Sequence, residues 1–421
     1  MKDLNDPFPP EGLPLDEARQ RVLAAVAACA PGTTEPTASE RLPLASALGR
    51  VCAETLLAPA AVPGFRAAIL DGYAIPDAVA PIEGASWRVV GRSAPGAPHP
   101  HTLATGEAVR ILTGAPLPEG AHRVLAQEGV ECRGDLVHLT RAIGTNPWVR
   151  AADEEARAGD PLLQPGERFS VATLGRLAGC GVARVRVRRR PRLGLLITGD
   201  ELVPPGEPRG DGQIWESNSA LLTALLERLG YGIADRRVVS DQPEPLRQAL
   251  ITLARTCDVV VSTGGVSAGD TDWIRPLVAE LGTVQFWKLF LKPGRPLAFG
   301  ELLGRPFFGL PGNPVAAVIT ALQLLWPALQ CWEGAPVEPL PRLQVRLESA
   351  LRRGAGRPEL ARARLVTAAD GLLSARLEGS QASSRIGSLL GADLLLEIPA
   401  DLGDVPAGTL LWAQLLRLPL F

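Results

Sequence analysis

Hydrophobic and polar residues between positions 193 and 327 alternate in a pattern typical of successive strands and helices. Three apolar runs, LGLLI, DVVVS and VQFWKLFL, predict buried strands, because a strand of a parallel sheet is covered on both faces. Apolar residues recur at helical spacing over 219–229, 244–254 and 271–281. Ser217 or Asn218 is expected to cap the first of these helices. The alternation predicts a three-layer α/β domain with a parallel-rich sheet.

The rest of the chain follows other patterns. One helix is predicted over 15–28 and a shorter one over 171–178. From about 54 to 150, short alternating pieces broken by glycine and proline indicate a small β-rich domain. The basic run RVRVRRRP at 184–191 alternates valine with arginine, which favours an edge or linking strand over a nucleic-acid-binding patch. Strand-sized pieces such as LQVRLES and LLLEIP follow from about 340.

Length, charge and cysteine use narrow the class of protein. A chain of 421 residues is too long for one core, and its net charge of −2 argues against a nucleic-acid partner. We identify no basic leader and no apolar run near the roughly 18 residues that span a membrane, so we expect a cytoplasmic protein without a membrane anchor. The six scattered cysteines are predicted to be small buried residues in a reducing compartment. The four histidines lack the spacing of a zinc site.

Polar turns follow the predicted strands LGLLI and DVVVS and a third apolar run, PFFGL at 306–310. These turns are Thr198-Gly199-Asp200-Glu201, GGVSAGDTD at 264–272 and Pro311-Gly312-Asn313-Pro314. Ligands of such folds bind beyond the carboxyl ends of the strands, and the glycines allow the backbone to approach a ligand closely. Asp270 and Asp272 would repel a bare phosphate, whereas Mg²⁺ could bridge carboxylate to phosphate. The alternative is that both aspartates only cap the next helix. The chain has neither a Rossmann glycine motif nor a P-loop at these turns.

A cationic stretch, FWKLFLKPGRPLAFG, accompanies these turns. Lys288 and Lys292 are four residues apart in a strand-like run, so they are expected on one side of the sheet, with Arg295 as a third cation. They would otherwise be solvated charges of an edge strand. Carboxylates and cations at one rim are the groups that a phosphorylated or oxyanionic substrate with a divalent metal requires.

Six segments together carry a family resemblance. They are LDGYAI (70–75), RILTGAPLPEGA (110–121), TGDEL (198–202), STGGVSAGDTDW (262–273), FWKLFLKPGRPLAFG (286–300) and FGLPGNPVAAV (308–318). In this order they resemble the molybdopterin molybdenumtransferase (MoeA) family, which is related to the C-terminal domain of gephyrin. The resemblance spans nearly the whole chain.

The resemblance implies an elongated subunit of four domains that forms a homodimer. The first expected unit is a linking domain formed by 15–54 and 151–184, whose N-terminal helix packs partly on the α/β domain. The other three are an inserted β-rich domain (55–150), an α/β molybdopterin-binding domain (185–339) and a C-terminal β-barrel (340–421). The implied fold class is therefore α/β plus β. Members of the family insert molybdate into adenylated molybdopterin and release AMP with the help of a divalent cation, here expected to be Mg²⁺. Molybdopterin adenylyltransferase is a candidate partner.

Site residues follow from the same resemblance. Asp71 and Thr113 would reach the active site from the β-rich domain, across the dimer interface; without the resemblance, Asp71 would be part of a plain turn. The remaining expected catalytic residues are Asp153, Glu201, Asp241 and Asp272, and the last three would surround the metal. The expected substrate-binding residues are Thr198, Gly264, Gly265, Ser267, Lys288, Lys292, Arg295, Pro311, Gly312, Asn313, Pro314 and Ser380.

Two segments depart from the family pattern. The family commonly has D-N-S where this chain has Arg66-Ala67-Ala68, and an arginine where it has Trp148. The alternative to an enzyme is therefore a related protein that binds a pterin or nucleotide without turnover, or a scaffold like gephyrin. Retention of a set of clustered charges favours the enzyme, since a scaffold has no need of them: Glu201, Asp241, Asp272, Lys288 and Lys292. A related nucleotide pyrophosphatase would leave DGYA and LTGAP unexplained.

Overall fold

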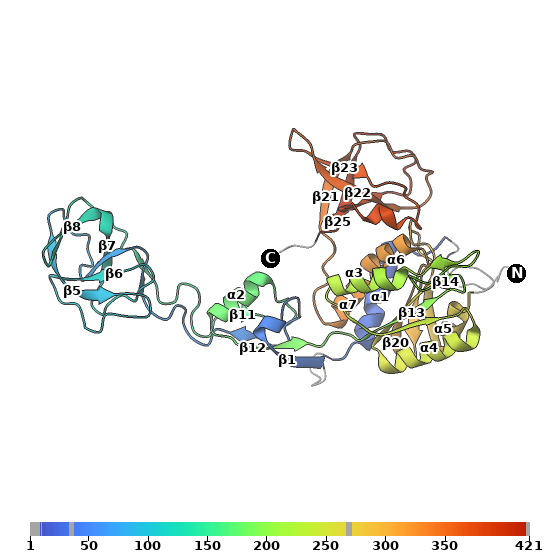
Figure 1. Ribbon diagram of the computed structural model, residues 1–421, viewed down its shortest axis with the longest axis horizontal. Helices are drawn as coiled ribbons and strands as arrows, with labels where there is room; N and C mark the ends of the chain where they lie inside the picture. The colour runs from blue at the N-terminus through green and yellow to red at the C-terminus, as the bar shows by residue number, and fades with distance from the viewer. Residues whose placement is uncertain (1–8, 10, 33–37, 267–271, 418–421) are drawn as a thin grey trace.

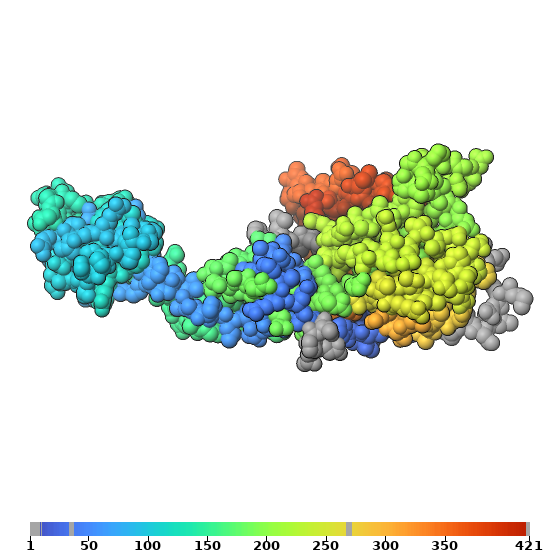
Figure 2. Space-filling model, turned by 60° about the horizontal axis from the view of Figure 1, so that its bottom comes forward, coloured from blue at the N-terminus to red at the C-terminus, as the bar shows by residue number. Residues whose placement is uncertain are grey.

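The protein is elongated, with a small β-rich unit at one end and a larger α/β unit and a barrel at the other (Figure 1, Figure 2). The computed structural model describes residue 9 and residues 11–32, 38–266 and 272–417. A narrow linking unit lies between the two ends. The multidomain α/β plus β architecture expected from the sequence is confirmed.

The central sheet has six strands in the order β16-β13-β17-β20-β19-β18. Its strands are β13 (Leu193–Thr198), β16 (Ile233–Val239), β17 (Val259–Thr263), β18 (Gly282–Trp287), β19 (Ala298–Leu302) and β20 (Arg305–Leu310). The first four in sheet order are parallel, and β19 is antiparallel to both β20 and β18. A small parallel pair, β14 (Leu202–Val203) and β15 (Ile214–Trp215), follows β13. The prediction of a parallel-rich sheet is therefore confirmed.

The prediction of one strand through VQFWKLFL is wrong. β18 ends at Trp287, and Lys288 has a φ of +88°, which no strand residue adopts. Because the chain leaves the sheet at Lys288, the two-residue side-chain alternation of a strand does not extend to Lys292. The inference that both lysines face one side of the sheet has no basis in the fold.

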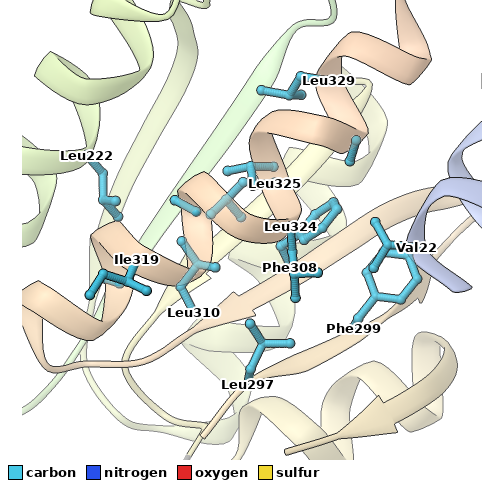
Figure 3. Packing of buried hydrophobic residues seen from close by; sticks show 14 of the residues in the cluster. Val22, Leu222, Leu297, Phe299, Phe308, Leu310, Ile319, Leu324, Leu325 and Leu329 are labelled. Atoms are coloured by element: carbon cyan, nitrogen blue, oxygen red, sulfur yellow. The ribbon is translucent and has the colours of Figure 1, made fainter. Parts of the chain in front are cut away.

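Two hydrophobic cores cover the two faces of this sheet, because successive strand residues point in opposite directions. Leu195 and Ile197 pack on one side with α1 (Leu15–Cys29), whereas Leu196 packs on the other. The first core also contains α3 (Asn218–Arg228), α6 (Pro314–Thr320) and α7 (Trp326–Trp332), and the second contains α4 (Pro243–Thr256) and α5 (Ile274–Leu281). Figure 3 shows Phe299 and Phe308 of the sheet against Leu324 and Val22. The expected three layers are present.

One continuous helical stretch contradicts the prediction that the chain has no apolar run long enough to span a membrane. α6, a π-helical turn at Ala321–Leu325 and α7 together form Pro314–Trp332, 19 residues with a mean hydropathy of 1.5. The wide turn lies just before Pro327, which has no N–H to donate. Because 89% of its apolar window is buried inside the fold, this is the core helix of the α/β unit.

The linking unit is built on one antiparallel pair. β1 (Ser39–Pro43) pairs with β12 (Arg184–Arg188), in which Val185 and Val187 are buried while Arg184 and Arg186 are exposed. This alternation confirms the linking strand with one solvated basic face. The same unit contains β2 (Leu56–Leu57), β11 (Pro161–Leu163) and α2 (Val171–Gly179). Ser170 caps α2 by accepting a hydrogen bond from the Thr173 N–H.

The β-rich unit and the barrel complete the chain. The β-rich unit has a six-stranded sheet in the order β7-β4-β6-β5-β9-β8. Its strands are β4 (Gly72–Ile75), β5 (Ser86–Ser93), β6 (Glu107–Ile111), β7 (Arg123–Ala126), β8 (Val130–Arg133) and β9 (Leu136–Leu139), beside the short pair β3 (Ala67–Ala68) and β10 (Val149–Arg150). The closed barrel consists of β21 (Arg342–Leu347), β22 (Glu359–Thr367), β23 (Leu373–Leu377), β24 (Leu394–Ile398) and β25 (Leu410–Leu415).

A buried charge network joins the linking unit to the α/β unit. The Glu333 carboxylate accepts hydrogen bonds from the Tyr231 hydroxyl at 2.7 Å and from Arg168 at 3.1 Å, and Arg190 lies 3.8 Å away. The Glu333 side chain is fully buried. Burial and the Glu333 charge raise the pKa of Tyr231, so its hydroxyl stays protonated and donates.

The cysteine prediction is only partly right. All six are free thiols, and Cys52, Cys180 and Cys257 are buried as expected. Cys132 is exposed on β8, where its Sγ lies 2.8 Å from the Tyr73 hydroxyl, so the prediction of a buried residue is wrong there. Its strand β8 is short and lies at the edge of the sheet, and no residue of this strand is buried.

Candidate active site

A cavity of about 1090 Å³ opens where β13, β17 and β20 end. This is the rim that the sequence predicted, because parallel strands bring the turns that follow them to one edge of the sheet. The cavity wall contains many of the expected residues: Thr198, Glu201, Asp241, Gly264, Gly265, Asp272, Lys292, Arg295, Pro311, Gly312, Asn313 and Pro314. Residues of the barrel form the opposite wall, so the site lies between the α/β unit and the barrel.

Hydrogen bonds fix the acidic side of the cavity. Thr198 ends β13, and its hydroxyl donates a short hydrogen bond to the Asp241 carboxylate, which follows the neighbouring strand β16. The Asp241 N–H donates to the Asp200 carboxylate at 2.9 Å. Two adjacent strand ends are thereby tied together, so the Asp241 carboxylate is held in place before any ligand arrives.

The glycine turn after β17 requires residues without a Cβ atom. Gly264 and Gly265 have φ values of +91° and +62°, and a Cβ on Gly264 would lie 2.3 Å from the Thr198 carbonyl oxygen. Thr263 donates from its hydroxyl to the Pro311 carbonyl at 3.0 Å. The glycine turn and the PGNP turn are thus held against each other.

Asn218 strengthens this junction and was not among the predicted site residues. Its side-chain amide donates to the Thr263 hydroxyl and to the Gly312 carbonyl, both at 2.8 Å. It does not cap α3, and neither does Ser217. Instead Glu216 accepts a hydrogen bond from the Ser219 N–H at 2.8 Å, so the predicted cap is wrong. Glutamate is not among the preferred N-cap residues, so the sequence favoured Ser217 and Asn218 instead.

The cationic side of the cavity is anchored to the barrel. Lys292 lies 3.2 Å from the carboxylate of Glu359, which is 1% exposed and also lies 3.2 Å from Arg353. Backbone hydrogen bonds join Lys292 to Pro358 at 2.9 Å and to Leu360 at 2.8 Å. The buried carboxylate therefore positions the lysine at the cavity wall, while almost half of the lysine side chain stays accessible.

Barrel residues supply a wall that the sequence analysis largely missed. The wall includes Arg357, Gln381, Ser383 and Ser384, whereas the predicted Ser380 is exposed next to it and does not line the cavity. The Ser383 carbonyl accepts a hydrogen bond from the Val315 N–H at 3.1 Å, at the start of α6. No signal in the sequence marks these residues, because their position depends on how the barrel packs on the α/β unit.

The three acidic residues do not form a ready-made metal cage. Within the part of the chain that the structure describes, no group of three or more histidine, cysteine, aspartate or glutamate residues is arranged to hold a metal ion. Glu201, Asp241 and Asp272 nevertheless share the cavity wall. Mg²⁺ is commonly held by one or two carboxylates together with substrate phosphates, and this arrangement suits such binding better than a cage.

Asp71 and Thr113 meet each other but not the cavity of their own chain. The Asp71 carboxylate accepts hydrogen bonds from the N–H and the hydroxyl of Thr113, each at 2.7 Å, and these bonds hold the pKa of Asp71 below its usual value. Both residues adjoin strands β4 and β6, in the unit at the far end of the molecule (Figure 1). A single chain therefore does not bring them to the rim.

Three other predicted residues are not in the cavity wall or cannot be described. Lys288 does not line the cavity, and Asp153 forms an exposed ion pair with Arg157 at 2.9 Å in the linking unit. Ser267 lies outside the described residues, as does Asp270. The described part of the turn thus contributes Gly264, Gly265, Val266 and Asp272 to the wall.

The chain matches three family descriptions in succession. Residues 13–181 match the MoeA N-terminal region (domain I and II), residues 194–330 a probable molybdopterin binding domain, and residues 344–416 the MoeA C-terminal region (domain IV). A Haemophilus influenzae protein named molybdopterin molybdenumtransferase is 32% identical over 94% of this chain and 96% of the relative. The chain belongs to the MoeA family.

Further MoeA relatives agree with this family. Molybdopterin molybdenumtransferase 2 of Mycobacterium tuberculosis is 31% identical over 93% of this chain and 97% of the relative. The structure also superposes on the crystal structure of a molybdopterin biosynthesis MoeA protein from Pyrococcus horikoshii OT3, with a TM-score of 0.79 and 26% sequence identity. The superposition covers 96% of this chain and 99% of the Pyrococcus chain. The predicted resemblance is confirmed, and with it a transferase of molybdenum cofactor biosynthesis.

Proposed function

We propose that this MoeA protein inserts molybdate into adenylated molybdopterin and releases AMP in a Mg²⁺-dependent reaction in the cytoplasm. The observation that carries the proposal is the cavity at the strand ends, which has carboxylates on one side and cations on the other. Its volume of about 1090 Å³ suits a large substrate with a phosphate group, since ligand pockets commonly measure 300–1,000 Å³. Molybdopterin adenylyltransferase is the proposed partner because it would supply the adenylated substrate.

Each side of the cavity has a distinct role in this proposal. Glu201, Asp241 and Asp272 would hold the cation, which supplies charge neutralisation at the phosphate oxygens when bound. The backbone of the Gly264–Gly265 turn can approach those oxygens, because no Cβ stands in the way. The Lys292 ammonium, held by Glu359, would attract molybdate as a point charge. The direct test is AMP release on mixing the protein with adenylated molybdopterin, molybdate and Mg²⁺.

The outcome separates the enzyme from the alternative. Substrate-dependent release of AMP that requires both the cation and molybdate would support the transferase. Tight binding of the substrate without AMP release would instead favour a pterin-binding or scaffold homologue.

We also propose a homodimer whose active site uses both chains. The support is that Asp71 and Thr113 lie far from the rim of their own chain, and a symmetric dimer can bring them to the rim of the partner without a long internal loop. A mixture of Asp71→Ala and Asp272→Ala chains should regain part of the activity, because a mixed dimer contains one intact site. AMP release is the measurement.

Each variant alone supplies the baseline for this mixing experiment. Self-mixed Asp71→Ala and self-mixed Asp272→Ala proteins should stay inactive after the same exchange treatment. A mixed dimer that is as inactive as both parents would count against a shared site.

Lys292 is predicted to bind the oxyanion. Methionine keeps the length and apolar stem of lysine but removes its charge, so Lys292→Met should raise the molybdate concentration for half-maximal AMP release by about tenfold. The melting temperature should change little, because Arg353 still pairs with Glu359. The exposed Arg228→Met at the end of α3 is the control for loss of a positive charge elsewhere.

Lys288→Met tests the second lysine of the proposal. A shift like that of Lys292→Met would mean that the dimer or the bound substrate brings Lys288 into contact. A shift below about twofold for both variants would leave the lysines as ordinary surface charges.

A further inference from the structure

A rigid, exposed aromatic ring lies at the edge of the cavity. Trp215 ends β15 and lines the cavity, yet 50% of its surface is exposed. In Figure 2 the green segment that contains β14 and β15 projects next to the red barrel. Tryptophan is costly to leave in water, because its large apolar surface gains free energy when it is covered. The position therefore calls for an explanation.

Several contacts hold this ring in one orientation. The Trp215 indole N–H donates to the Glu207 carbonyl at 2.9 Å, and the guanidinium of Arg209 stands 4.0 Å from the ring centroid. The strand itself is fixed, because the Ile214 N–H donates to the Glu201 carbonyl at 2.8 Å. Arg209 covers one face of the ring, so a flat ligand would have to stack on the opposite face.

The chemistry of the neighbouring cavity indicates the ligand class. The same wall carries the carboxylates and the glycine turn to which we assign the metal and the phosphate. A ligand that places its phosphate there and stacks on Trp215 must carry a planar ring. Stacking of a nucleobase on an aromatic side chain contributes about 1–3 kcal/mol.

We propose that Trp215, held by Arg209, is the stacking platform for a planar fused nitrogen heterocycle of the substrate. Adenylated molybdopterin contains two such groups, the adenine and the pterin, and either could stack in the same way. The inference rests on the proposed function for the identity of these rings. Its test uses the isolated ring compounds, so it can succeed or fail independently of AMP release.

The experiment measures binding of AMP and of a pterin monophosphate to the full chain by tryptophan fluorescence and calorimetry. Trp215→Ala should weaken binding of one of the two ligands by at least about tenfold, which corresponds to about 1.4 kcal/mol, and should abolish the quenching caused by that ligand. Trp215→Phe keeps a smaller aromatic ring, so it should weaken binding of that ligand less than Trp215→Ala does. Arg209→Ala should also weaken binding, because the ring loses its support.

The chain offers a matched control. Trp412 on the barrel is 45% exposed and has the Arg342 guanidinium 4.8 Å from its ring, but it does not line the cavity. Trp412→Ala should leave both affinities within twofold of the unmodified chain. The ligand that responds to Trp215→Ala identifies the stacked ring.

Two outcomes would overturn the platform. In the first, a folded Trp215→Ala protein binds both ligands with affinities within twofold of those of the unmodified chain. In the second, the unmodified chain shows no measurable binding of either ligand. Failure of the proposed function gives a different result: ring binding would depend on Trp215, while the unmodified protein released no AMP from adenylated molybdopterin. Normal AMP release by the unmodified protein, together with ring affinities that Trp215→Ala leaves within twofold, would refute the stacking role and leave the proposed function intact.

Discussion

Replacement of Asp272 by alanine is expected to lower the rate of AMP release by about 100-fold or more, equivalent to about 2.7 kcal/mol of transition-state stabilisation. Asp272 lies in the cavity wall with Glu201 and Asp241, where the proposed cation would bridge carboxylate and phosphate. Removing one carboxylate leaves the cation with fewer ligands and the phosphate charge less neutralised. The rate should be measured at saturating Mg²⁺ and substrate.

The control for this variant is an aspartate of the same unit. Asp211 is exposed and lies outside the cavity wall, so Asp211→Ala should keep the rate within twofold. Asp272→Ala should have the melting temperature of the unmodified protein, since Asp272 is partly exposed. Unchanged AMP release by Asp272→Ala would refute its assignment to the metal and phosphate.

Replacement of Glu333 is expected to have the largest effect on stability. Glu333→Leu would leave Arg168 and Arg190 without their shared carboxylate and Tyr231 without its acceptor. Breaking a buried ion pair costs about 3–5 kcal/mol, and we expect the lower end, because the two arginine side chains remain 29% and 30% exposed. If the α/β unit unfolds as one cooperative unit of about 150–250 residues, a loss of about 3 kcal/mol lowers its melting temperature by roughly 6 °C or more.

Thermal unfolding followed by circular dichroism measures this loss. Glu227→Leu makes the same chemical change at an exposed position on α3, and its melting temperature should stay within about 2 °C of the unmodified protein. The melting temperature of Tyr231→Phe should lie between those of Glu333→Leu and Glu227→Leu, because this change removes one hydrogen bond and no charge. A Glu333→Leu protein as stable as the Glu227→Leu control would show that the network contributes little.

Local sequence determined most of the fold. The apolar runs at β13 and β17 are buried on both faces, so their pattern alone distinguishes them from exposed strands. The alternating valines of β12 likewise indicate a strand with one buried face, and the helical spacing of apolar residues in α4 indicates a helix. Parallel strands must end at one edge of a sheet, and for that reason the turns after Ile197, Ser262 and Leu310 could be assigned to one rim before the structure was known.

Tertiary structure decided which charged groups face that rim. The backbone turn at Lys288 ends β18, and the buried Glu359 of the barrel holds Lys292, so two lysines of similar local sequence have different positions. The barrel wall, from Arg357 to Ser384, is separated from the strand ends in sequence and meets them only through packing. Burial of the long apolar helix Pro314–Trp332 likewise depends on the sheet and α1 around it.

The sequence by itself therefore determined most of the strands and helices and the rim, because these follow from the side-chain period of each element and from the glycines its turns require. Only the tertiary structure decided the barrel wall of the cavity, the separation of Asp71 and Thr113 from the cavity, and the support of Trp215 by Arg209. These depend on contacts between units that are distant along the chain, and no local period encodes such contacts.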